Sequence, residues 1–180
     1  KLPVSALILN SPFLDMNMSW FMEEVVIPVI SFIGNYFPNL EVEGKGISQY
    51  AHSLLKRIHG EWEYNENWKK TTGHPKKAGW IHAIHKGHQT IQKGLNLTCP
   101  ILVMSSDKSI PETKIWNELY HTSDIVLDVK DIQKYGKMLG SRVTCKQIHN
   151  GKHDLILSNE PARKETYQVI FSWLKQQSGK

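Results

Sequence analysis

The chain has 180 residues, which is enough for one domain with a substantial hydrophobic core and too few for two. Hydrophobic residues make up 40% and charged residues 22%, so disorder and a coiled coil are excluded, and two cysteines exclude a disulfide scaffold or a cysteine-only zinc site. The net charge of +5 is modest and dispersed, and the densest basic stretches are short pairs, so we do not expect nucleic-acid binding. No apolar run reaches the roughly 18 residues of a membrane helix, so we expect no transmembrane segment.

The first part of the chain predicts one strand followed by helices. The apolar run Val4–Leu9 is short and continuous, which favours a strand buried on both faces, as in a parallel sheet. Trp20–Ile33 is apolar and aromatic but interrupted by Pro28, so it predicts one kinked helix or two short ones.

The middle of the chain is mainly helical by its pattern. Pro38–Gly46 is rich in turn residues, and Ile47–Ile58 has its apolar residues at helical spacing, with Gly60 as the expected stop. Ala78–Ile91 is also expected to form a helix.

A regular alternation of strands and helices begins near residue 100. Ile101–Met104 predicts a buried strand, Val129–Leu139 an amphipathic helix with Gly140 as its C-cap, and Arg142–Ile148 a strand nearer the sheet edge. Ala162–Lys175 predicts the closing helix. This order predicts an α/β fold, in which ligands bind beyond the carboxyl ends of the strands.

An acid and a histidine follow successive strands in this part of the chain. Asp124 and His153 are separated by one helix and one strand, so both should lie at the same edge of the sheet. A carboxylate that accepts the Nδ1–H of a histidine fixes its tautomer and stabilises the imidazolium formed when Nε2 takes a proton from a nucleophile. The order acid, then histidine, after the nucleophile is the order found in α/β-hydrolases.

Several segments together resemble one enzyme family. Asn10–Asp15, Asp124–Val129, Leu139-Gly140, His153-Asp154 and Leu157-Ser158 are similar to the C-terminal half of an α/β-hydrolase. Among these enzymes, the chain looks most like the serine hydrolases that group with monoglyceride lipases and lysophospholipases. The resemblance implies the C-terminal part of an α/β-hydrolase sheet, formed by residues 1–11 and 98–180, with a helical cap inserted at residues 12–97.

The resemblance also implies roles for individual residues. Asp124 corresponds to the acid of the catalytic triad and His153 to its base, and Phe13, Trp20 and Phe21 would contact substrate at the mouth of the pocket. The expected activity is hydrolysis of carboxylic esters, of the esterase or lysophospholipase kind, on an acyl or lipid-like substrate. This chemistry needs no metal or organic cofactor, and we expect a cytoplasmic enzyme.

Two further carboxylates compete with Asp124 for the role of the acid. In the family the acid follows its strand directly, whereas here Ser105–Ser109 is followed by about fifteen extra residues before Asp124. Asp107 lies within that first loop. Asp128 precedes the predicted helix at Val129 and is interpreted as its N-cap.

The Gly-x-Ser-x-Gly motif that carries the nucleophile of such enzymes is absent from the 180 residues. We therefore expect the serine on an N-terminal portion of the same protein, or on a companion chain, because without it no acyl-enzyme can form. The 180 residues alone would expose a sheet edge, so we expect poor solubility or a homodimer.

Two other functions stay open. A related serine aminopeptidase would use acidic residues to hold the amino terminus of its substrate, and Glu23-Glu24 or Glu41 and Glu43 could do so. The chain could instead be a non-catalytic ligand-binding unit on the same scaffold.

Other residues with chemical potential are interpreted as structural. His82, His85 and His88 would not converge on one metal ion from a helix, because i and i+6 point in different directions. Cys99 and Cys145 are interpreted as reduced structural thiols. The aromatic and methionine-rich stretch from Met16 to Phe37 could be core, or a lid over an acyl pocket.

Overall fold

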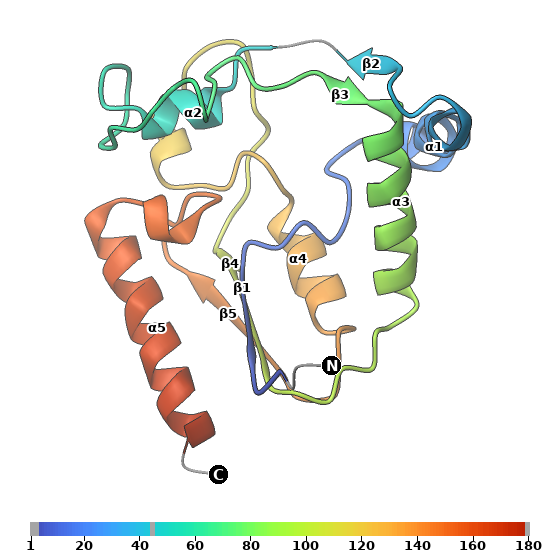
Figure 1. Ribbon diagram of the computed structural model, residues 1–180. Helices are drawn as coiled ribbons and strands as arrows, with labels where there is room; N and C mark the ends of the chain where they lie inside the picture. Colours follow the sequence, from blue (N-terminus) through green and yellow to red (C-terminus); the bar gives the residue numbers. More distant parts are fainter. Residues whose placement is uncertain (1–3, 44–45, 179–180) are drawn as a thin grey trace.

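A computed structural model describes residues 4–43 and 46–178. Residues 1–3 of the predicted core segment and residues 44–45 of the predicted turn-rich link lie outside the described residues. The chain folds as a parallel sheet with helices on both faces, and the segment between its first two strands contains further helices and a second, two-stranded antiparallel sheet (Figure 1).

Three strands form the central sheet in the order β1-β4-β5, and all are parallel. Their bounds are β1 Leu7–Asn10, β4 Ile101–Ser106 and β5 Val143–Ile148. The central strand β4 is buried at every position. Strand β1 is only half-buried, which corrects the expectation of a fully buried strand, because it has one paired neighbour within the described part of the chain.

Helices cover the two faces of this sheet (Figure 1). On one face Ile101 and Val103 pack with Ile132 of helix α4, which spans Val129–Gly136. On the other face Leu102 and Met104 pack with Trp173 of helix α5, which spans Glu160–Ser178. Since successive strand residues point to opposite faces, a strand covered on both sides needs a continuous apolar run, and β4 has one.

The remaining elements lie between β1 and β4 or in the loops after β4 and β5. Between the strands are π-helix η1 (Met22–Val26), α1 (Ile27–Tyr36), β2 (Glu41–Glu43), α2 (Gln49–Leu54), β3 (Lys76–Lys77) and α3 (Ala78–Gln92). Two 3-10 helices, η2 (Glu118–His121) and η3 (Leu155–Leu157), follow β4 and β5 respectively.

Two predicted helix ends are wrong, and each has a steric reason. Helix α2 ends at Leu54 because the chain turns back and Leu55 bridges Trp62; a Cβ on Gly60 would lie 1.9 Å from the Leu54 backbone. Helix α4 ends at Gly136, and Gly140 is not its C-cap. Gly140 instead bridges Leu97, whose carbonyl oxygen would lie 2.2 Å from an added Cβ.

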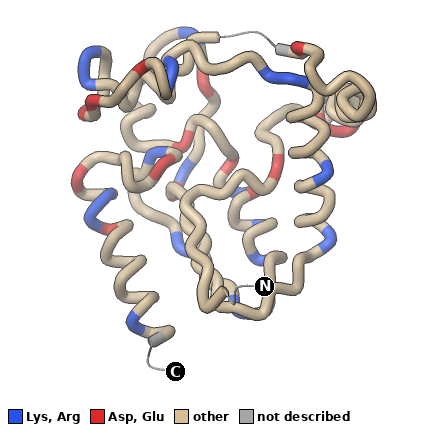
Figure 2. Tube along the Cα trace, viewed as in Figure 1, with Lys and Arg blue, Asp and Glu red and all other residues tan. Residues whose placement is uncertain are grey.

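The stretch from Met16 to Phe37 contributes to the core and to the surface. Met16 and Ile27 are buried against Ile81 of α3, while Phe32 and Phe37 are exposed. The predicted kink at Pro28 corresponds to the junction where η1 continues into α1. Lys and Arg are spread over residues 46–178, whereas residues 4–43 carry none (Figure 2). None of the helices in the described ranges is both long and apolar enough to span a membrane.

Candidate functional site

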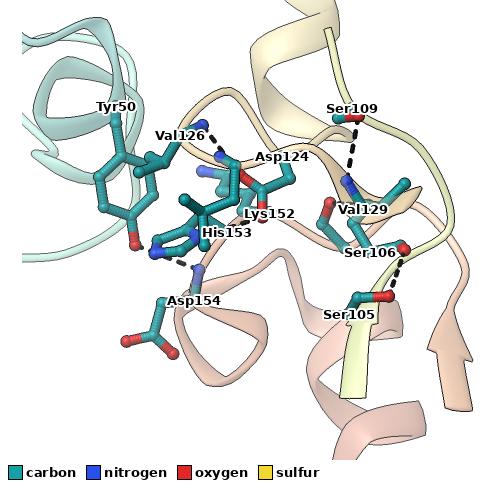
Figure 3. A network of polar contacts seen from close by, with 12 residues as sticks. Tyr50, Ser105, Ser106, Ser109, Asp124, Val126, Val129, Lys152, His153 and Asp154 are labelled. Carbon is teal, nitrogen blue, oxygen red and sulfur yellow. Dashed lines mark hydrogen bonds and ion pairs between the residues drawn. The ribbon is translucent and has the colours of Figure 1, made fainter. Parts of the chain in front are cut away.

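Asp124 and His153 meet at the carboxyl end of the sheet (Figure 3). The Nδ1 atom of His153 lies 3.0 Å from Oδ2 of Asp124. Asp124 is fully buried, and the His153 side chain is 23% exposed. The structure therefore brings together the two residues that the sequence nominated as acid and base, from loops 29 residues apart.

The backbone around Asp124 explains how the acid reaches this position after so long a loop. Asp124 forms a parallel bridge with Ser109, in which the Asp124 N–H donates to Lys108 O and the Ile110 N–H donates to Asp124 O. Residues 110–123 thus leave the sheet edge and return to the same place. The extra residues form an excursion, and the acid still lies directly beside the extension of β4.

The Asp124 carboxylate is held in a fixed orientation. Its Oδ1 accepts hydrogen bonds from the N–H groups of Val126 (2.8 Å) and Leu127 (2.9 Å), so Oδ2 is directed at His153. A histidine that donates Nδ1–H to a carboxylate has its lone pair on Nε2. The arrangement can therefore accept a proton at Nε2 and stabilise the resulting imidazolium.

The two competing carboxylates have other partners. Asp107 contacts Nδ1 of the exposed His149 at 2.9 Å and accepts from Asn150 N–H. Asp128 accepts from the Lys130 N–H at 2.9 Å, which is the geometry of an N-cap for α4.

Three contacts around His153 were not predicted from the sequence. The Tyr50 ring lies edge-on to the imidazole, with centroids 5.5 Å apart, and its hydroxyl accepts from the Asp154 N–H at 3.3 Å. Burial raises the pKa of Tyr50 well above its ordinary value. The Asp154 carboxylate accepts from Asn10 Nδ2 at 2.7 Å, which ties the end of β1 to the His153 loop. These residues lie far apart in sequence, so local patterns gave no signal.

Lys152, next to His153, is buried although lysine is usually exposed. Its Nζ donates to the Ser53 carbonyl at 2.5 Å, and burial lowers its pKa to about 8. The only sequence signal for it was its place beside a candidate base.

A cavity of about 390 Å³ opens beside His153. It is bounded by side chains from the β1–α1 segment, from β3 and α3, and from the Asp124 loop: Phe13, Met16, Asn17, Met18, Lys76, Trp80, Ile81, Val126, Leu127 and His153. Most of these are apolar or aromatic, which suits an apolar ligand.

The predicted substrate-binding residues divide between this cavity and the surface. Phe13 lines it and stacks against Trp80, with ring centroids 6.4 Å apart. Trp20 and Phe21, which immediately precede η1, do not line it, and they are 73% and 58% exposed. Their predicted contact with substrate therefore gains no support from this geometry.

The acidic residues considered for a peptidase lie elsewhere. Glu23 and Glu24 line a different cavity, of about 300 Å³, together with Asp15 and His88. Burial and the neighbouring Asp15 carboxylate raise the pKa of Glu23. Glu41 is exposed, and the Glu43 side chain lies outside the described part of the structure.

The three histidines of α3 contact separate groups. His82 Nδ1 lies 2.8 Å from Ser31 O, His85 Nε2 lies 3.0 Å from Gln89 Nε2, and His88 Nε2 lies 3.1 Å from Phe13 O. Within residues 4–43 and 46–178, no group of three or more potential ligands is arranged to hold a metal ion. Cys99 and Cys145 are free and half-buried.

No family model and no curated protein matches the chain. Solved structures, in contrast, do match the chain. The chain is similar to a monoacylglycerol lipase from Paleococcus ferrophilus, with a TM-score of 0.63 and 14% identity over 97% of this chain and 60% of that one. It is also similar to a soluble variant of monoglyceride lipase from Saccharomyces cerevisiae in complex with a substrate analogue, with a TM-score of 0.59 and 11% identity over 96% of this chain and 56% of that one.

These likenesses show the fold. The predicted α/β-hydrolase fold is confirmed, and the chain spans less than two thirds of the length of either lipase, which fits the predicted C-terminal part.

Proposed function

We propose that this chain supplies the acid and the base of a serine hydrolase that cleaves carboxylic esters of an acyl substrate. The observation that supports it most is the contact between His153 Nδ1 and the carboxylate of Asp124, which is buried and accepts two hydrogen bonds from backbone N–H groups. The nucleophile would be a serine outside these 180 residues, on another portion of the same protein or on a companion chain.

The proposed reaction proceeds in two halves. His153 Nε2 takes the proton of the serine hydroxyl while Oγ forms a bond to the ester carbonyl carbon. The imidazolium, stabilised by Asp124, then gives this proton to the leaving alcohol as its bond to the carbonyl carbon breaks. A water molecule repeats the sequence on the acyl-enzyme, which releases the carboxylic acid and returns the proton to the serine.

The cavity beside His153 supports an acyl substrate. Phe13, Trp80 and Leu127 give it an apolar lining, which can bury an alkyl chain and exclude water from the ester. A peptidase is less well supported, because Glu23 and Glu24 line a separate cavity rather than the one that contains His153.

The test uses the full-length protein and a fluorophosphonate probe, which reacts with activated serines. His153→Ala should slow labelling by roughly 10³-fold or more, since the serine loses its proton acceptor. His149→Ala is the matched control, because it removes the exposed imidazole that pairs with Asp107 and should leave labelling unchanged.

Two results would contradict the proposal. Equal labelling of the His153→Ala and His149→Ala variants removes His153 from the mechanism, and no labelling of the wild-type protein favours a non-catalytic role. Faster turnover of an aminoacyl anilide than of a p-nitrophenyl acyl ester would favour the peptidase.

A further inference from the structure

The lysine that precedes the proposed base in the sequence is buried. Lys152 is 2% exposed, and its Nζ donates to the carbonyl of Ser53, a residue in the last turn of α2. Figure 3 shows Lys152 next to His153 and Asp124. Because burying an ammonium group is costly, a lysine in this position calls for a structural or functional reason.

The surroundings of Lys152 only partly compensate its charge. The nearby Glu61 carboxylate favours the ammonium form, whereas burial disfavours it more strongly. His121 of η2 also lies within electrostatic reach, and its pKa is lowered by its own burial and by Lys152. The direct partner is thus the Ser53 carbonyl, which carries part of the negative charge at the C-terminal end of α2.

Helix α2 needs such an anchor. It has six residues, too few to be stable without tertiary contacts. It also holds Tyr50, whose ring lies edge-on to His153 and whose hydroxyl accepts from the Asp154 N–H. At its start, Gln49 donates through Nε2 to Lys114 O, in the excursion that precedes Asp124. The helix therefore contacts the loops of both proposed catalytic residues.

We propose that Lys152 is a positioning residue for His153. By holding the C-terminal carbonyl of α2, it fixes the Tyr50 ring against the imidazole and keeps the Nδ1–H directed at Asp124. Its effect on catalysis rests on the proposed function, but its effect on the imidazole does not.

The test follows the Nδ1 proton of His153 by NMR in the full-length protein. A proton hydrogen-bonded to a buried carboxylate exchanges slowly with water, and we expect Lys152→Met to accelerate this exchange at least tenfold. Lys152→Arg, which keeps a cation and its donors, should restore slow exchange. Lys175→Met makes the same change at an exposed site on α5 and is the control.

The route through α2 is tested separately with Tyr50→Leu, which leaves the lysine and its carbonyl partner in place. This variant should also accelerate exchange of the His153 Nδ1 proton. If Lys152→Met does not fold, as judged by the absence of a cooperative unfolding transition, Tyr50→Leu becomes the decisive variant. Wild-type exchange in the decisive variant overturns the proposal.

A second measurement separates this proposal from the proposed function. In the full-length protein, Lys152→Met should reduce fluorophosphonate labelling roughly 10- to 100-fold, as small misplacements of catalytic groups do. If His153→Ala labels normally while Lys152→Met still accelerates proton exchange, the positioning role stands and the hydrolase function fails. If labelling needs His153 but both exchange and labelling are normal in Lys152→Met, the positioning role fails alone.

Discussion

The burial of Lys152 predicts an unusual dependence of stability on pH. Its pKa is about 8 in the folded chain, against 10.5 for an unperturbed lysine. Between these two values the unfolded chain binds more protons than the folded one, so stability must rise with pH in that window. Below pH 8 the lysine is charged in both states, and the full cost of burying the ammonium applies.

The size of the effect follows from the two pKa values. A difference of about 2.5 pKa units corresponds to a limit of about 3 kcal/mol. Only part of it is gained in an accessible range: raising the pH from 7 to 9 should increase the contribution of Lys152 by about 1 kcal/mol. The neutral amine can still donate an N–H to the Ser53 carbonyl, so the contact need not be lost.

The assay is urea unfolding of the full-length wild-type protein and of its Lys152→Met variant at pH 7, 8 and 9. Other titrating groups, including Cys145, whose pKa is raised by burial, are present in both proteins, so their effects largely cancel in the difference. The free energy of unfolding of the wild type, minus that of the variant, should therefore increase by about 1 kcal/mol from pH 7 to pH 9. A constant or falling difference would refute the inference that the charged form is penalised by burial.

Two further substitutions test the local structure around the site. Gly60→Ala should lower the free energy of unfolding by about 2 kcal/mol or more, because the added Cβ would overlap the Leu54 backbone. Gly46 has open space around it, so the control Gly46→Ala should change the free energy of unfolding by less than about 0.5 kcal/mol. Equal urea midpoints for these two variants would contradict the steric account. Asp128→Ala should cost about 1 kcal/mol through loss of the α4 N-cap while fluorophosphonate labelling of the full-length protein stays within about twofold. A large loss of labelling would instead make Asp128 the catalytic acid.

Local hydrophobic patterns in the sequence predict much of the sheet and of the helices that cover it. The run Ile101–Met104 is apolar at successive positions, which requires cover on both faces, and α4 and α5 provide it. The acid and the histidine could be nominated because the carboxyl ends of parallel strands lie at one edge of the sheet. Such features depend on residues a few positions apart, so the sequence alone determines them.

The choice of partners was decided by the tertiary structure. The sequence left Asp107, Asp124 and Asp128 as candidate partners of His153. The bridge between Ser109 and Asp124 returns residues 110–123 to the sheet edge and places the Asp124 carboxylate against the imidazole. The contacts of Tyr50 and Lys152 join residues about a hundred positions apart. Local periodicity says which side of a helix is apolar, but not which distant loop it will meet, because that depends on how the whole chain closes around its core.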